Sequence, residues 1–315
     1  MSESKKQYTI LLVDDEPRIT SALKTVFRRD YEVLVANSGR DALSIMEQHT
    51  IDVLVSDQRM PEMTGSQLLA TVRRTHPQTM RILLTGFMDR QAIVDSINDG
   101  EVYRFINKPW DNIEIRQIVA EAASASELPL GTIFLGDGTV VEDGVDDGFE
   151  KATKGKAILM LEKSQSVRNQ IRKFFSQREV MIYSTQNVEQ AVSAATSRNN
   201  IGVVIIELSG KGAETTIQTI NLLKQARPEL VTIVLTQEYD AQIAVDLINQ
   251  GQVFKYIAKP IDTDKLHVAI DAAFRRFLYL KDNKSLQQRY KVNKPKGRIA
   301  ANLQSLFSSL LGSSK

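Results

Sequence analysis

The sequence predicts an α/β protein built from two consecutive domains, each with a parallel sheet. Two observations support this prediction: short apolar runs alternate with amphipathic stretches from Tyr8 onward, and the same alternation returns from Ile158. Runs that are apolar throughout are typical of strands buried on both faces, and strands that alternate with helices indicate a parallel sheet between helical layers. The length of 315 residues fits two domains of ordinary size.

The first series contains five strand–helix units. Its expected strands are the apolar runs Ile10–Val13, Val33–Val35, Val53–Val55, Ile82–Leu84 and Val102–Ile106. A helical stretch is expected after each strand, and the apolar face is clearest in Ile19–Phe27, Ala42–Met46 and Ile113–Val119. Five such units fit the flavodoxin-like, doubly wound (βα)5 order, in which binding sites lie at the carboxyl ends of the strands.

The second series repeats the first. Its expected strands are Ile158–Leu161, Val203–Ile206, Ile233–Leu235 and Val253–Ile257. The clearest duplicate is Asp99–Pro109, which matches Gln250–Pro260 at a spacing of 151 residues. Thr85 and Thr236, which end the fourth strand of each copy, obey the same spacing. A repeat of this kind indicates two copies of one domain.

These patterns divide the chain into a first domain, a linker, a second domain and a tail, over residues 1–124, 125–154, 155–280 and 281–315. In the linker, Gly136–Gly138 lies between two β-prone runs and predicts a small hairpin. The acidic stretch Glu142–Glu150 does not match the calcium-loop pattern. The linker is therefore expected to be an exposed connection and not a calcium site.

The tail turns basic from Lys281, and apolar residues recur at helical spacing between Ile299 and Leu311. An amphipathic helix of this kind packs on the body of the protein or docks into a partner, and both interpretations stay open. Binding to a membrane surface or to DNA ranks behind them, since the sequence has no apparent helix-turn-helix module.

Composition excludes several classes of function. The net charge of +2 gives no reason to expect affinity for nucleic acid or membrane. The chain has no cysteine, which excludes disulfides, thiolate metal sites and cysteine nucleophiles. No apolar run approaches the roughly 20 residues that cross a bilayer, and the polar segment Met1–Gln7 has no signal core. A cytoplasmic protein is expected.

Charged and polar side chains stand where the strands of the first domain end. They are Asp14, Asp15, Asp57, Thr85 and Lys108. Because the carboxyl ends of parallel strands meet at one edge of the sheet, these side chains are expected to share a pocket. Clustered carboxylates repel one another unless a cation lies among them, and oxygen ligands suit Mg²⁺. The metal, the ammonium and the hydroxyl together suit phosphoryl transfer onto a carboxylate.

Over about Tyr8–Ala123 the chain resembles the receiver domain of bacterial response regulators. The resemblance rests on Leu12–Pro17, Ser56–Pro61, Thr85-Gly86 and Lys108-Pro109. It implies that Asp57 accepts a phosphoryl group from a histidine kinase, and that Thr85 and Lys108 bind this group.

The same resemblance implies a metal site and a switch. The Mg²⁺ ion would be held by Asp14, Asp15, Asp57 and the backbone carbonyl of Arg59. Phe105 matches the aromatic switch position three residues before the lysine. Gly86 is small and leaves room for the phosphoryl group to enter.

The second domain departs from the motif where the chemistry depends on it. Glu162, Lys163, Glu207 and Gln237 stand at the positions of Asp14, Asp15, Asp57 and Gly86, whereas Thr236, Lys259 and Pro260 are retained. A lysine in the acidic pair competes with a metal, and the longer Glu207 is poorly placed to accept phosphate. We therefore predict a degenerate pseudo-receiver. Two interpretations stay open: a contact between Glu207 and Lys259 mimics an activated state, or the site has decayed.

The leading function is a phosphorelay response regulator without an enzymatic or DNA-binding output domain. The expected partners are a sensor histidine kinase or phosphotransfer protein and a downstream protein effector, with a second copy of the chain as a further candidate. Phosphorylation is expected to draw Thr85 toward the phosphoryl group and to move the surface that includes Phe105.

Rival functions fit less well. A haloacid-dehalogenase-like phosphatase needs a second aspartate two residues after its nucleophile, where Arg59 stands. A dinucleotide-binding enzyme needs a Gly-x-Gly-x-x-Gly turn after the first strand, which is missing. The alternative is a transcription regulator that binds DNA through the basic tail, which predicts salt-sensitive binding that requires residues after Leu280.

Overall fold

The computed structural model describes residues 8–86, 102–126, 153–175, 180–208, 213–237, 241–251, 253–284 and 287. The chain divides into two compact units, Met1–Ile133 with Asp240–Asn249, and Phe134–Tyr239 with Gln250–Lys315. The expected linker hairpin and the expected amphipathic helix of the tail lie outside the described residues.

The first unit contains a five-stranded sheet in the order β2-β1-β3-β4-β5. All of its strand pairs are parallel. The strands are β1 (Thr9–Val13), β2 (Glu32–Ala36), β3 (Val53–Asp57), β4 (Met80–Thr85) and β5 (Arg104–Asn107). The strands β1, β3 and β4 are apolar almost throughout because both of their faces are covered, as the sequence predicts.

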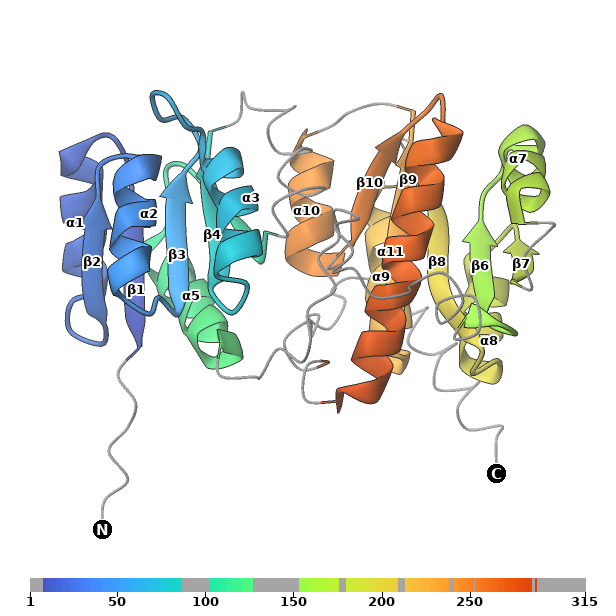
Figure 1. Ribbon diagram of the computed structural model, residues 1–315. Helices are drawn as coiled ribbons and strands as arrows, with labels where there is room; N and C mark the ends of the chain where they lie inside the picture. Colours follow the sequence, from blue (N-terminus) through green and yellow to red (C-terminus); the bar gives the residue numbers. More distant parts are fainter. Residues whose placement is uncertain are drawn as a thin grey trace, which may run out of the picture. The chain divides into compact units, whose positions relative to one another are not determined.

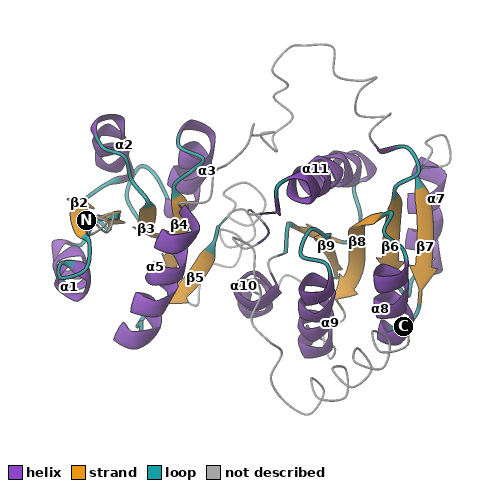
Figure 2. Cartoon of the chain, turned by 90° about the horizontal axis from the view of Figure 1, so that it is seen from below, coloured by secondary structure: helices purple, strands orange, loops and turns teal. Residues whose placement is uncertain are grey.

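Helices cover both faces of this sheet (Figure 1). They are α1 (Pro17–Phe27), α2 (Gly39–Gln48), α3 (Gly65–Thr75) and α5 (Asn112–Ser126). Seen end-on in Figure 2, α1 and α5 lie on one face and α2 and α3 on the other. Local signals set two of the helix starts: the Ser38 side chain accepts the Asp41 N–H before α2, and Thr64 and Gln67 form a capping box before α3.

The second unit contains another five-stranded, all-parallel sheet, in the order β10-β9-β8-β6-β7. The strands are β6 (Ala157–Leu161), β7 (Met181–Thr185), β8 (Ile201–Leu208), β9 (Val231–Thr236) and β10 (Lys255–Ala258). The helices of this part of the sequence are α7 (Gln165–Phe175), α8 (Val188–Ser197), α9 (Ala213–Ala226), α10 (Ala241–Gly251) and α11 (Thr263–Asp282). In Figure 2, α7 and α11 cover one face of the sheet and α8 and α9 the other.

The predicted fold, two doubly wound parallel sheets in tandem, is confirmed. The strand that sequence inspection did not locate is β7, which lies at one edge of its sheet. Its sequence, MIYST, ends in Ser184 and Thr185 and is not an apolar run, since an edge strand is only half covered. No helix within the described part of the chain is long and apolar enough to cross a bilayer.

Candidate functional site

The carboxyl ends of four neighbouring strands bring the predicted side chains of the first unit together. Asp14 follows β1, Asp57 is the last residue of β3, Thr85 is the last residue of β4, and Lys108 follows β5. Because β1, β3, β4 and β5 are adjacent in the sheet, these ends form one edge. The parallel arrangement alone therefore collects two carboxylates, a hydroxyl and an ammonium from residues that are far apart in sequence.

At this edge Lys108 lies between two carboxylates. Its Nζ is 2.5 Å from Asp57 Oδ1 and 2.8 Å from Asp14 Oδ2. Both aspartates are buried, with exposed fractions of 1% for Asp14 and 6% for Asp57. We call Asp14, Asp57 and Lys108 the first ion cluster.

Backbone N–H groups hold the other oxygens of the two carboxylates. The Arg59 N–H donates to Asp57 Oδ2 at 2.7 Å, and the Glu16 N–H donates to Asp14 Oδ1 at 2.9 Å. Each donor comes two residues after the carboxylate it binds, so the turn that leaves the strand fixes the side chain. One oxygen of each aspartate is thus anchored, and the other faces Lys108.

Burial and charge act in opposite directions on the groups of this cluster. Burial raises the pKa of Asp57, although the hydrogen bond from Lys108 opposes the change. Burial alone would lower the pKa of Lys108, but Asp14 and Asp57 outweigh this effect and raise it above its ordinary value. Lys108 is therefore a firmly charged cation beside a carboxylate that is more basic, and hence more nucleophilic, than an exposed one.

The remaining predicted residues of the first domain lie around the cluster. Asp15 is exposed, and the described residues contain no group of three or more acidic, histidine or cysteine side chains that could hold a metal. The Thr85 hydroxyl is buried and donates to the Gly86 carbonyl at 3.2 Å. Phe105, at the predicted switch position, is 1% exposed. The structure thus brings together two of the three predicted carboxylates.

Sequence reasoning did not identify Gly65, the first residue of α3, as part of the site. A Cβ atom at this position would lie 2.2 Å from the carbonyl oxygen of Asp57. The Gly65 N–H also donates to the Gln58 carbonyl at 3.0 Å, and the Gln58 side chain bonds to Ser66. A side chain at Gly65 would therefore displace the end of β3 that carries Asp57. The sequence feature that could have indicated this role is the glycine directly after Thr64. Only the tertiary structure shows that Gly65 approaches the carbonyl oxygen of Asp57.

Gly65→Ala is expected to destabilise the first unit by about 2 kcal/mol. The new methyl group would overlap the Asp57 carbonyl oxygen, and this main-chain atom cannot move away without displacing β3. The measurement is urea unfolding followed by the fluorescence of Trp110, which packs against the core of the first unit. Gly86→Ala is the matched control, since a Cβ at Gly86 would meet no atom of the described residues within 4 Å. Equal stability of the two variants would contradict the role given to Gly65.

The second unit has a corresponding cluster, formed by Glu162 after β6, Glu207 near the end of β8 and Lys259 after β10. Lys259 Nζ lies 2.7 Å from Glu207 Oε1 and 2.9 Å from Glu162 Oε2. The Glu162 side chain is buried, at 0% exposed, and the other two are mostly covered, with exposed fractions of 11% for Lys259 and 12% for Glu207. We call these residues the second ion cluster.

Burial and charge act in opposite directions on the pKa values of the second ion cluster as well. Burial raises the pKa of Glu162. Burial would also raise the pKa of Glu207, but hydrogen bonds from Lys259 and from the Lys163 N–H hold it below its usual value. Burial alone would lower the pKa of Lys259, but Glu207 and Glu162 outweigh this effect and raise it. Lys259 is thus the cation that both glutamates require.

The other predicted residues of the second site contribute backbone contacts or are exposed. Lys163 contributes its backbone N–H, 3.2 Å from Glu207 Oε2, while its side chain is exposed. Thr236 is buried, and its carbonyl accepts the Lys259 N–H at 2.7 Å. The same backbone bond, at 2.9 Å, joins Lys108 to Thr85 in the first unit. Gln237 is exposed.

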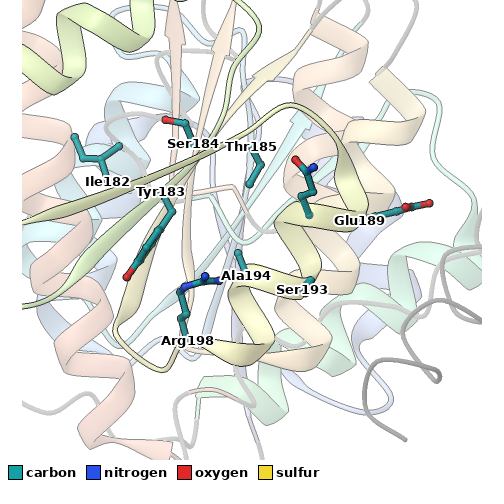
Figure 3. A pocket seen from close by; sticks show the side chains of 9 residues that line it. Ile182, Tyr183, Ser184, Thr185, Glu189, Ser193, Ala194 and Arg198 are labelled. Atoms are coloured by element: carbon teal, nitrogen blue, oxygen red, sulfur yellow. The ribbon is translucent and has the colours of Figure 1, made fainter. Parts of the chain in front are cut away.

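A groove of about 580 Å³ lies along β7 and α8 of the second unit (Figure 3). In it the Arg198 guanidinium lies over the Tyr183 ring, 4.8 Å from the ring centroid. The Thr185 hydroxyl is buried and has no hydrogen-bond partner among the described residues. The groove shares no residue with the second ion cluster.

Comparison with known proteins decides the family. A family model described as response regulator receiver domain matches residues 10–120 and again residues 158–271. The chain belongs to this family. It carries two receiver domains in tandem, and the two ion clusters lie at corresponding strand ends of the first and the second receiver.

Relatives are similar over part of their length. The hydrogenase transcriptional regulatory protein HoxA of Bradyrhizobium diazoefficiens is 31% identical over 218 residues, which are 68% of this chain and 42% of HoxA. The transcriptional regulatory protein GlrR of Escherichia coli is 32% identical over 124 residues, which are 39% of this chain and 28% of GlrR. The chain therefore spans less than half the length of these relatives.

Among solved structures, one similar chain is the signal receiver domain of an HD domain-containing protein from Pseudomonas fluorescens. It is 32% identical, covers 40% of this chain and 94% of its own, and has a TM-score of 0.39. The assignment of the fold rests on the two sheets and on the family model.

Proposed function

We propose that this chain is a response regulator of a phosphorelay, in which Asp57 accepts a phosphoryl group from a sensor histidine kinase or a phosphotransfer protein. The observation that carries the proposal is the first ion cluster, where Lys108 Nζ lies within 2.8 Å of both Asp57 and Asp14. An ammonium in that position can neutralise the oxygens of a phosphoryl group on Asp57.

In the proposed step, a carboxylate oxygen of Asp57 forms a bond to phosphorus while the phosphorus–nitrogen bond of the donor phosphohistidine breaks. The electron pair of that bond remains on the imidazole nitrogen, and the product is an aspartyl phosphate. The Arg59 N–H would hold the orientation of the carboxylate, since it binds Asp57 Oδ2. The Thr85 hydroxyl would turn from the Gly86 carbonyl to a phosphoryl oxygen. The open space beside Gly86 would admit the group.

Receiver domains bind Mg²⁺ at the phosphorylation site. The residues present fit this ion, because Asp14 and Asp57 direct one oxygen each to the point where Lys108 now lies. Asp14 and Asp57 would hold the ion, with Asp15 and the Arg59 carbonyl as further proposed ligands. When bound, the ion would supply charge neutralisation to the phosphoryl oxygens. Lys108 would then leave the carboxylates and bind the phosphoryl group.

The second receiver, in this proposal, does not accept a phosphoryl group. Lys259 takes the position of a metal between Glu162 and Glu207 and neutralises them without one. Lys259 and the Lys163 N–H bind the two oxygens of Glu207 and hold its pKa below the usual value, whereas burial raises the pKa of Asp57. The less basic carboxylate is the weaker nucleophile. The cluster favours a permanent ion-paired state over a decayed site, since all three side chains remain paired.

The chain would act through contacts with a downstream protein and not through a reaction of its own. The surface that includes Phe105 is proposed to change when Asp57 is phosphorylated. The relatives named as transcriptional regulatory proteins are matched over 42% of their length or less, so the role in their names is not proposed for this chain.

Phosphorylation of the full chain by acetyl phosphate with Mg²⁺ tests the proposal. Intact mass is expected to show one added phosphoryl group per chain. The fluorescence of Trp110, the single tryptophan, is expected to change at the same time, because it lies two residues after Lys108. Absence of any added phosphoryl group in the presence of Mg²⁺ would overturn the proposed function.

A further inference from the structure

The last strand of the first sheet is an edge strand, yet it is buried along its length. In the strand order β2-β1-β3-β4-β5, one side of β5 has no neighbouring strand among the residues that the structure describes. All the same, Arg104 is 5% exposed, Phe105 1% and Ile106 3%. An uncovered edge presents unpaired backbone groups to water, so another element must cover this one.

The structure contains a specific cover for this edge, the side chain of Asn249 on α10. Its Oδ1 accepts the Phe105 N–H at 2.9 Å, and its Nδ2 donates to the Phe105 carbonyl at 2.9 Å. Residues through Asn249 of this helix belong to the first compact unit, although they come from the second sequence repeat. The contact is thus part of the first unit.

The geometry of the strand explains why one amide suffices. The Lys108 N–H points toward Thr85 in β4. Along a strand, the backbone N–H and C=O groups of successive residues point to opposite sides. Phe105 is three positions before Lys108, so its backbone groups point away from β4, to the open edge. A carboxamide carries an acceptor and donors side by side. Asn249 therefore binds both groups of Phe105 as a further strand would. On the same helix, Ala244, Val245, Leu247 and Ile248 are buried.

We propose that the open edge of β5 at Phe105 is a docking surface for α10, and that phosphorylation of Asp57 releases this helix. We call the pair of hydrogen bonds between Asn249 and Phe105 the β5 clamp. In the unphosphorylated chain the clamp closes the surface. After phosphorylation the edge of β5 and the apolar side chains of α10 become available to a downstream protein. This inference rests on the proposed function.

The path from Asp57 to the clamp is short. Thr85 is paired in register with Asn107, and its carbonyl accepts the Lys108 N–H at 2.9 Å. Movement of Thr85 and Lys108 toward a phosphoryl group pulls on the end of β5, next to Phe105. Both hydrogen bonds of the β5 clamp join the Asn249 side chain to the backbone of Phe105. A shift of β5 at Phe105 therefore weakens both together.

Amide hydrogen exchange of Phe105, measured by NMR on the full chain, tests the clamp. Asn249→Ala is expected to speed exchange at Phe105 about tenfold, as the loss of net hydrogen bonding in a locally opening strand predicts. Asn249→Asp keeps an acceptor for the N–H but repels the carbonyl, and should have an intermediate effect. The matched control is Gln242→Ala, an exposed amide on the same helix that pairs with Asp246. This control should leave Phe105 unchanged.

Phosphorylation by acetyl phosphate and Mg²⁺ is then expected to speed exchange at Phe105 in the wild type to the level of Asn249→Ala. Equal exchange in wild type, Asn249→Ala and Asn249→Asp would overturn the clamp. If intact mass shows a phosphoryl group and exchange at Phe105 does not change, the release is wrong and the proposed function stands. If no phosphoryl group is added, the proposed function fails and release fails with it, while the Asn249 variants still decide whether the clamp exists.

Discussion

Replacing Asp57 by alanine is expected to abolish phosphorylation of the chain, whereas replacing Glu207 by alanine leaves it unchanged. Lys108 and the Arg59 N–H bind the two oxygens of Asp57, whose pKa burial nevertheless raises. Its counterpart Glu207 is bound in a similar way, but its hydrogen bonds hold its pKa below the usual value. The measurement is transfer of radiolabelled phosphate from a small phosphodonor with Mg²⁺, with the amount per chain determined for both variants.

The result for Asp57→Ala is expected to fall below detection, because the acceptor atom is removed. Lys108→Ala serves as a second comparison, since it keeps the acceptor and removes the cation that neutralises the product; it is expected to reduce transfer without removing it. Phosphate that remains on the chain in Asp57→Ala and disappears in Glu207→Ala would show that the roles of the two receivers are reversed.

Replacing Lys259 by methionine is expected to destabilise the second receiver by about 3 kcal/mol. Removal of one partner from a buried ion pair leaves the other charge uncompensated. Glu162 is 1% exposed, and Glu207 shares the same lysine. Because burial already raises the pKa of Glu162, this residue can take up a proton in the variant, which limits the loss.

Two probes separate the receivers in the denaturation experiment. Trp110 packs against the core of the first receiver, so its fluorescence reports the unfolding of that receiver, while circular dichroism reports both. Lys259→Met should shift the transition seen by circular dichroism and leave the Trp110 transition in place. Lys108→Met is the matched control and should shift both the Trp110 transition and the part of the circular dichroism signal that comes from the first receiver.

Neutral partners should restore much of the stability lost in Lys259→Met. In the triple variant with Glu162→Gln and Glu207→Gln no charge remains buried, so its free energy of unfolding is expected to lie closer to wild type. If Lys259→Met unfolds at the same denaturant concentration as wild type, the second ion cluster does not stabilise the domain, and the interpretation of a decayed site gains support.

Much of the fold could be predicted because its determinants are local or repeat along the chain. Strands such as Ile10–Val13 and Val203–Ile206 are apolar throughout, and only a strand covered on both faces has that composition. The spacing of 151 residues between Lys108 and Lys259 then identified the second copy. The strand β7 escaped detection because Ser184 and Thr185 interrupt its apolar pattern at the edge of the sheet.

The chemistry of the first site could also be predicted in part. Asp14, Asp57 and Lys108 stand at the carboxyl ends of three strands that are far apart in sequence, and parallel strands must bring these ends to one edge. The sequence could not decide which atoms pair there. A contact between Glu207 and Lys259 was one of two open interpretations, and the distance of 2.7 Å from Glu207 Oε1 to Lys259 Nζ shows that the contact forms.

The sequence by itself therefore determined the residue types, the order of the strands along the chain and the set of side chains that share an edge. The tertiary structure alone decided the contacts between atoms: the approach of Gly65 to the Asp57 carbonyl, the two glutamates on Lys259 and the amide of Asn249 on Phe105. The physical reason is the distance along the chain over which each feature is determined. Hydrophobic periodicity depends on neighbouring residues, whereas a hydrogen bond between residues 144 positions apart depends on how whole elements pack.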